Sequence, residues 1–297
     1  MPSSTSHKQK STVSSSKPFI VANWKADTLE YKQAEKNILE TYKLLSGSAS
    51  KVELVFAPVA TQIHALKNIF DGSFKYAKPR RIKLPKIALA AQNISVYEGG
   101  SKTGEIPVAA MKDAGVKYAI IGHSECRELG DTNATVITKV QLALANKIGV
   151  ILCVGERERD SGVQYLRVVE EQLVSVFSAI DKKDHNSITI AYEPVWAINN
   201  KDNISLDSNG LHSMVVYIRK LLIQRFGEGS SKEVRIIYGG SVTPENAQDI
   251  LWNGEVQGLL IGRASWTPQS LAGIITSALI NPKKNILKQY GASKKNK

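Results

Sequence analysis

The sequence contains little cysteine, no long apolar run and no arginine near its start. Two cysteines, Cys126 and Cys153, are too few for a disulfide framework and fit free thiols of a reducing compartment. No stretch approaches the roughly 18 consecutive apolar residues that a membrane span needs. Residues 1–17 lack both the apolar core of a secretory signal and the arginine-rich pattern of a mitochondrial presequence. These absences favour a soluble cytoplasmic protein that contacts no membrane.

Disorder and fibrous folds do not fit the composition, since 42% of the residues are apolar and 22% are charged. The length of 297 residues suits two average domains. However, α/β barrels of about 250 residues fold as one domain, so length alone does not decide the domain count.

The formal net charge of +12 suggests a polyanionic partner when taken alone. Three lysines lie in residues 1–17, six lie in residues 283–297, and neither segment has an acid. Residues 75–86 add six further cations. Because both ends lack the apolar content to fold, we expect disordered basic tails at 1–17 and 283–297 around one folded domain at 18–282.

Eight short apolar segments recur along the domain and alternate with segments of helical periodicity. Within each segment the apolar residues follow one another instead of alternating with polar residues, which is typical of strands buried on both faces. Eight such β-then-α units in about 265 residues predict an α/β fold, a single closed (β/α)₈ barrel of parallel strands. The expected strands span 19–22, 52–57, 87–91, 118–121, 150–154, 188–192, 234–238 and 259–261, and the clearest helices span 31–45, 135–146, 163–179, 211–226 and 244–251.

A doubly wound open sheet is the competing architecture. It usually carries Gly-x-Gly-x-x-Gly after its first strand, and this chain has Ala22-Asn23-Trp24-Lys25 there. The barrel is therefore the preferred prediction.

Polar side chains follow three of the expected strands, at the end where such barrels place their chemistry. They are Asn23 and Lys25 after the first strand, His123 and Glu125 after the fourth, and Glu193 after the sixth. A carboxylate after a buried strand suits a general base. A neutral histidine at a helix start can donate a hydrogen bond, and Lys25 and Asn23 can stabilise an oxyanion. Each residue alone is more often structural, so it is their joint occurrence that favours a catalytic site.

Glycines follow the seventh and eighth strands, in Gly239-Gly240-Ser241 and in Gly262-Arg263. Glycines also serve tight turns, but at these positions they would expose backbone N–H groups near helix starts. Such groups form the usual phosphate cradle of a barrel.

Seven segments, in their order and spacing, resemble triosephosphate isomerase across roughly residues 18–280. They are Asn23-Trp24-Lys25, Ala91-Gln92-Asn93, Thr103-Gly104-Glu105-Ile106, Ile121-Gly122-His123-Ser124-Glu125, Cys153-Val154-Gly155-Glu156, residues 191–198 and Tyr238-Gly239-Gly240-Ser241-Val242. The resemblance implies a TIM barrel and a homodimer formed through the Thr103–Glu105 loop. It also implies an aldose–ketose isomerase of glycolysis and gluconeogenesis, which interconverts dihydroxyacetone phosphate and D-glyceraldehyde 3-phosphate through an enediolate without cofactor or metal.

The same resemblance implies a role for each site residue. Glu193 is the base, neutral His123 is the electrophile, Lys25 and Asn23 stabilise the developing charge, and Glu125 contacts the lysine. The segment from Pro194 onward closes as a lid. Phosphate rests on backbone amides near Asn199, Ser241, Gly262 and Arg263.

The chain departs from the family pattern at three places. Asn199-Asn200-Lys201-Asp202 replaces the usual Gly-Thr-Gly-Lys of the lid, Arg263 replaces a second glycine, and Cys126 stands where an interface arginine is common. Asparagine tolerates positive φ, and Arg263 keeps its backbone N–H. We therefore expect an active isomerase with altered lid kinetics and a rearranged dimer interface.

Two other functions compete with this prediction. A basic binding protein would use the tails and residues 75–86 to hold nucleic acid or an acidic partner, with affinity that falls steeply with salt. No nucleic-acid motif or interleaved aromatic pattern supports it. A barrel that has lost activity through its altered lid is the second alternative, and the retained Asn23, Lys25, His123 and Glu193 argue against it.

Overall fold

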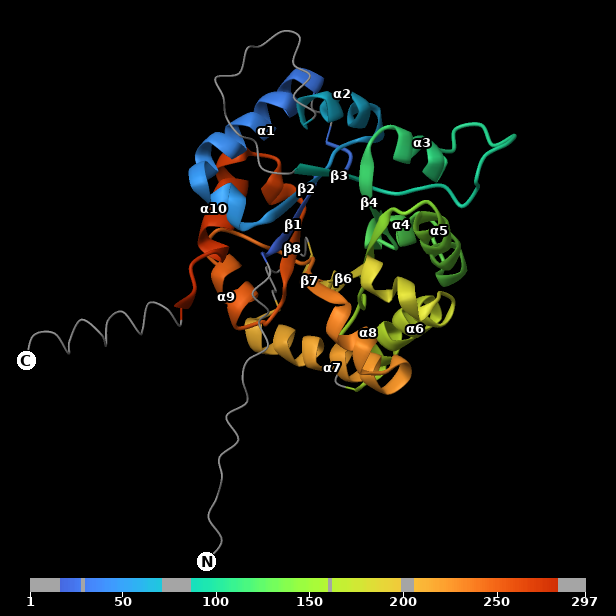
Figure 1. The fold of residues 1–297 in the computed structure, drawn as a ribbon. Coiled ribbons are helices and arrows are strands. Elements are labelled where there is room, and N and C mark those ends of the chain that lie inside the picture. Colours follow the sequence, from blue (N-terminus) through green and yellow to red (C-terminus); the bar gives the residue numbers. More distant parts are fainter. Residues whose placement is uncertain (1–16, 28–29, 71–86, 160–161, 199–205, 283–297) are drawn as a thin grey trace, which may run out of the picture.

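The computed structural model describes residues 17–27, 30–70, 87–159, 162–198 and 206–282. Its eight parallel strands form a closed barrel in chain order, and β8 pairs with β1 (Figure 1). The predicted single (β/α)₈ barrel is confirmed. The strands are β1 Phe19–Asn23, β2 Glu53–Ala57, β3 Ile87–Ala91, β4 Val116–Ile121, β5 Gly149–Val154, β6 Ile188–Tyr192, β7 Arg235–Tyr238 and β8 Gly258–Ile261.

Helices surround the barrel on its outside (Figure 1). The five helices expected from periodicity are confirmed, with ends that shift by up to three residues: α1 Tyr31–Leu45, α5 Asn133–Ala145, α6 Gln164–Ser178, α7 Ser208–Phe226 and α9 Ala247–Trp252. Further helices are α2 Ala60–Phe70, α3 Val108–Asp113, α4 Ser124–Glu128, α8 Glu228–Glu233 and α10 Pro268–Ala278, with 3₁₀ segments η1 Ser46–Lys51, η2 Lys182–Ser187, η3 Val195–Ala197 and η4 Arg263–Ser265.

Capping residues explain why two helices begin a few residues before the start that their apolar periodicity predicts. The Asp207 carboxylate accepts a hydrogen bond from the Gly210 N–H and starts α7 at Ser208. Thr132 and Thr135 form a reciprocal capping box that starts α5. Such caps satisfy N–H groups that the first helical turn leaves without partners.

The core has two layers because successive strand side chains point alternately into the barrel and toward the helices. The outer layer fills the space between strands and helices. The inner layer fills the barrel with Phe19, Val21, Val55, Ala57, Ala90, Ile120, Ile151, Cys153, Ala191, Ile237 and Leu260. The barrel interior is therefore packed, and any cavity for a substrate must lie at a rim.

Within the described ranges, no helix combines the length and the hydropathy that crossing a bilayer demands. The basic segments at 1–16, 75–86 and 283–297 lie outside the described residues. The prediction of disordered tails therefore stays a prediction.

Candidate active site

One cavity of about 310 Å³ lies where the carboxyl ends of β1, β6, β7 and β8 meet the residues after β4. Seven of the nine predicted site residues line it: Asn23, Lys25, His123, Glu193, Ser241, Gly262 and Arg263. Glu125 contacts this group through Lys25. Asn199, with the altered lid residues 199–202, lies outside the described residues.

Glu193 follows β6 directly and is only 2% exposed. Its Oε2 accepts a hydrogen bond from the Ser124 N–H at 3.3 Å, and its Oε1 lies 3.4 Å from His123 Nε2. Two glycines make room for it: a Cβ on Gly155 would lie 1.7 Å from the Glu193 carbonyl oxygen, and one on Gly239 would lie 2.7 Å from its Cγ. The neighbouring strand ends can therefore approach closely enough to bury the carboxylate.

His123 caps the N-terminus of α4 and is 7% exposed. Its Nδ1 accepts a hydrogen bond from the Glu125 N–H at 3.2 Å. An imidazole that accepts at Nδ1 carries its single proton on Nε2 and is neutral. The Nε2–H can therefore donate a hydrogen bond to a molecule in the cavity.

Lys25 lies just beyond β1 with a left-handed backbone (φ 53°), which is uncommon for lysine. Two neighbours hold this conformation: Asn23 Oδ1 accepts from the Lys25 N–H at 3.0 Å, and Gln92 Nε2 donates to the Lys25 carbonyl at 2.7 Å. The ammonium lies 2.7 Å from Glu125 Oε1. The strained turn thus carries a fixed cation to the cavity wall.

Ser241, Gly262 and Arg263 line the cavity after β7 and β8. A Cβ on Gly262 would lie 3.2 Å from Lys25 Cε, so the lysine side chain passes directly over this glycine. Arg263 begins η4, and the Ser241 hydroxyl donates to the Ala197 carbonyl at 3.2 Å. A cation beside glycine-bordered backbone is suited to an anionic group such as phosphate.

Sequence reasoning missed the role of Glu156, although the residue lies in the quoted Cys153–Glu156 segment. Its buried carboxylate accepts hydrogen bonds from the Tyr192 hydroxyl at 2.9 Å and from Trp196 Nε1 at 2.8 Å. Burial, together with this carboxylate, raises the pKa of Tyr192. Glu156 therefore anchors η3, the described start of the segment expected to act as a lid.

Both cysteines are free, as predicted. Cys153 is fully buried inside the barrel, and burial together with a hydrogen bond to the Glu193 carboxylate raises the pKa of its thiol well above the ordinary range. Burial also raises the pKa of the half-buried Cys126 thiol on α4. Neither thiol is therefore activated as a nucleophile.

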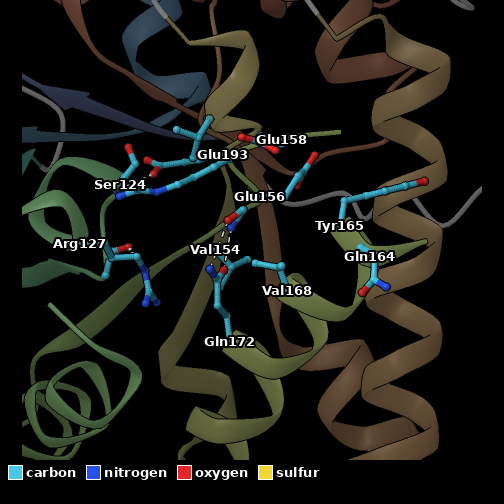
Figure 2. Close-up of a pocket in the computed structure, with 14 residues that line it drawn as sticks. Ser124, Arg127, Val154, Glu156, Glu158, Gln164, Tyr165, Val168, Gln172 and Glu193 are labelled. Carbon is cyan, nitrogen blue, oxygen red and sulfur yellow. Dashed lines mark hydrogen bonds between the residues drawn. The ribbon is translucent and has the colours of Figure 1, made fainter. Parts of the chain in front are cut away.

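A second cavity of about 490 Å³ lies behind Glu193, between the ends of β4, β5 and β6 and the start of α6. Figure 2 shows Ser124, Arg127 and Glu193 on one side of it, with Tyr165 and Gln164 on the other. Glu193 is among the residues that line both cavities. It therefore stands in the wall between them.

Residues 18–278 match the family model of triosephosphate isomerase. The chain is 37% identical to the triosephosphate isomerase of Treponema denticola over 250 residues, which cover 83% of this chain and 92% of that protein. It is 35% identical to the triosephosphate isomerase of Alkaliphilus metalliredigens, over 87% of this chain and 98% of that protein. It is 33% identical to that of Carboxydothermus hydrogenoformans, over 89% and 99% respectively.

These matches span the whole barrel and nearly the full length of each relative, and five of the seven predicted residues gathered at the cavity come from the segments that carry the resemblance. The chain belongs to the triosephosphate isomerase family.

Proposed function

We propose that this isomerase interconverts dihydroxyacetone phosphate and D-glyceraldehyde 3-phosphate through an enediolate, with Glu193 as the base and His123 as the electrophile. One observation carries the assignment: the base and the electrophile lie 3.4 Å apart, Oε1 to Nε2, at a cavity that also holds Lys25. A carboxylate and a neutral donor at this spacing can act on adjacent atoms of one small substrate.

The chemistry is a proton transfer between neighbouring carbons. Glu193 takes a proton from the carbon next to the carbonyl while the His123 Nε2–H donates to the carbonyl oxygen. The resulting enediolate is stabilised by the Lys25 ammonium and the Asn23 amide. Glu193 then returns its proton to the other carbon, and His123 moves a proton between the two oxygens. No electron leaves the substrate, so the step requires no redox cofactor.

The phosphate group would rest on backbone amides near Ser241, Gly262, Arg263 and Asn199. The first three border the cavity beside the Lys25 side chain, which supports this assignment. Closure of the segment from Pro194 would exclude water and protect the enediolate from loss of phosphate. Glu156 would hold the start of that segment through Trp196.

The assembly proposed for the enzyme is a cytoplasmic homodimer formed through the Thr103–Glu105 loop. The chain between β3 and α3 projects from the barrel (Figure 1), and Tyr97 and Ile106 on it are exposed. Leu129, after α4, is 89% exposed. Apolar side chains held in water on a projecting loop suit a partner surface. The two free thiols agree with a reducing compartment.

Shortening the base tests the proposed mechanism. Glu193→Asp withdraws the carboxylate from the substrate carbon, so kcat should fall roughly 100- to 1,000-fold while the fold is retained. The measurement is a coupled assay with glyceraldehyde 3-phosphate, with Glu228→Asp, an exposed site on α8, as the matched control. Wild type without turnover would refute the activity, and an unchanged rate in Glu193→Asp would refute the role of the base.

A further inference from the structure

Arg127, on α4, holds the turn that carries His123 and Ser124. Its Nε donates to the Gly122 carbonyl at 2.9 Å, and its Nη1 donates to Asn133 Oδ1 at 2.9 Å. Gly122 immediately precedes His123 and has a left-handed φ of 77°. The guanidinium is therefore fixed in place beside the active-site turn.

Arg127 is half-buried, and no carboxylate among the described residues forms an ion pair with it. Both of its hydrogen-bond acceptors are neutral, and Nη2 is buried with no acceptor. Burial lowers the pKa of the guanidinium, and the neighbouring Cys153, Asp131 and Glu193 groups raise it. Folding has thus placed a partly desolvated cation beside the active-site turn, which is typical of functional sites.

Arg127 and Glu193 line the same cavity behind the active site. In Figure 2, Arg127 lies beneath Ser124 and Glu193 on the same side of that cavity. The Ser124 N–H, which binds the carboxylate, belongs to the turn that Arg127 holds through Gly122. Ser124 and Arg127 both line the rear cavity, and neither is among the residues that line the substrate cavity.

We propose that Arg127 is a positioning residue for the catalytic carboxylate, and that its half-buried guanidinium favours the ionised, Ser124-bound form of Glu193 before substrate binds. The inference rests on the proposed role of Glu193 as the base. A carboxylate that is already ionised is ready to accept a proton, whereas a protonated one is inactive. Because Glu193 is only 2% exposed, a nearby positive charge acts on its carboxylate more strongly than it would in bulk water.

Other charged and titratable groups also face Glu193, and they must be separated from Arg127 in any test. They are Lys25 after β1; His123, Glu125 and Cys126 at α4; Cys153 and Glu156 on and after β5; Arg157 and Glu158, which line the rear cavity; and Arg263 after β8, which lines the substrate cavity. The Lys25 cation is paired with Glu125, and Glu156 accepts two hydrogen bonds. Arg127 therefore differs from Lys25 in that no carboxylate contacts its half-buried charge.

Changing the charge at Arg127 tests the proposal. In Arg127→Met, the acid limb of the kcat/KM profile should move to higher pH by roughly half to one unit, because the ionised carboxylate loses a stabilising charge. Arg127→Lys keeps a cation and should restore most of the shift. Arg225→Met, which removes an exposed arginine on α7, should leave the limb unchanged.

Asn133→Ala separates the effect of the Arg127 charge from the effect of the hydrogen bonds that fix the Arg127 side chain. It removes the Nη1 acceptor and leaves the cation, so it should lower the unfolding temperature without moving the acid limb. If Arg127 only holds the turn, Arg127→Met and Asn133→Ala will both lower that temperature and neither will move the limb. That result would overturn the proposal.

A second readout does not depend on activity. The carboxyl C=O infrared band that disappears in Glu193→Gln reports protonated Glu193 in the ligand-free protein, and it should appear at higher pH in Arg127→Met than in wild type. If the band appears at the same pH in Arg127→Met and in wild type, the proposal is overturned. A shifted band in a protein without isomerase turnover would support the charge effect and refute the proposed function.

Discussion

The position of the proton on His123 depends on one backbone hydrogen bond, from the Glu125 N–H to Nδ1. An imidazole that accepts at Nδ1 has its proton on Nε2, which lies 3.4 Å from Glu193 Oε1. The start of α4 therefore leaves the Nε2–H as the donor on the side of the ring that faces the base.

Lys25→Met should remove activity at little cost in stability. The ammonium stabilises the enediolate oxygen, so kcat/KM should fall at least roughly 100-fold. The Lys25–Glu125 pair is partly exposed and contributes less than about 1 kcal/mol to folding, so the unfolding temperature should barely change. The assay is compared with Lys117→Met, an exposed lysine on β4. Activity near that of wild type would show that Lys25 does not face the substrate.

At the scale of elements, buried polar contacts fasten the helices and loops that carry the site. Lys139 on α5 is almost fully buried, and its ammonium lies 2.7 Å from Asp131 Oδ1 and 3.0 Å from Asn93 Oδ1. One side chain thus joins α5 to the chain after α4 and to the loop after β3. That loop also contains Gln92, which supports Lys25.

Lys139→Met should destabilise the protein by about 3–5 kcal/mol, because it leaves the Asp131 carboxylate poorly solvated and unpaired. Urea unfolding followed by circular dichroism measures the loss. The double variant Lys139→Met, Asp131→Asn should recover part of it, since no buried charge then lacks its partner. A single variant as stable as wild type would contradict the assigned role of the pair.

The packing of η2 against α6, α7 and α8 should make stability depend on pH through His185. This fully buried ring lies 4.9 Å from the Phe177 ring and 5.6 Å from the Phe226 ring, between centroids, with Nδ1 2.7 Å from Ser230 Oγ. Burial lowers the pKa of His185. The unfolded chain therefore binds this proton more readily, and the stabilisation present above about pH 6.5 is lost as the pH falls through the folded-state pKa.

His185→Gln should reduce the difference in unfolding free energy between pH 7.5 and pH 5. Urea titrations at the two pH values measure it, and His64→Gln, at an exposed site on α2, is the matched control. An equal pH dependence in wild type and His185→Gln would show that another group is responsible.

At the scale of the whole molecule, the closed barrel brings distant segments to one rim. Asn23 and Gly262 are more than two hundred positions apart in the chain, yet both line the same cavity because β8 pairs with β1. The net charge of +12 is concentrated in three basic segments, 1–17, 75–86 and 283–297, and the rest of the chain carries a net charge of −3. The rim, rather than the global charge, supports the proposed reaction.

The proposed homodimer predicts a sedimenting mass near twice 32.5 kDa. Ile106→Asp places a charge on the projecting loop and should shift the protein toward monomer at micromolar concentration, because a carboxylate would be desolvated in the interface. Analytical ultracentrifugation measures the shift, and Val216→Asp, at an exposed site on α7, is the control. A monomeric wild type would contradict the proposed assembly.

Local patterns predicted the eight strands to within two residues and most of the residues at the rim. The reason is physical: strands buried on both faces read as continuous apolar runs, and groups that follow parallel strands must emerge at one end of a barrel. The short helices α3 and α8 were not predicted, because they lack a strong apolar stripe. Short helices depend on tertiary packing more than on their own periodicity.

The pattern of residues along the chain accounts for the fold class and for the set of polar groups that reach the rim. The pairing of these groups follows only from the folded chain: Gln92 holds the strained turn of Lys25, Glu156 holds Trp196, and Arg127 lies behind Glu193. Periodicity records which face of an element is buried. Hydrogen bonds and charges between segments far apart in the chain depend on distances that exist only after the barrel has closed.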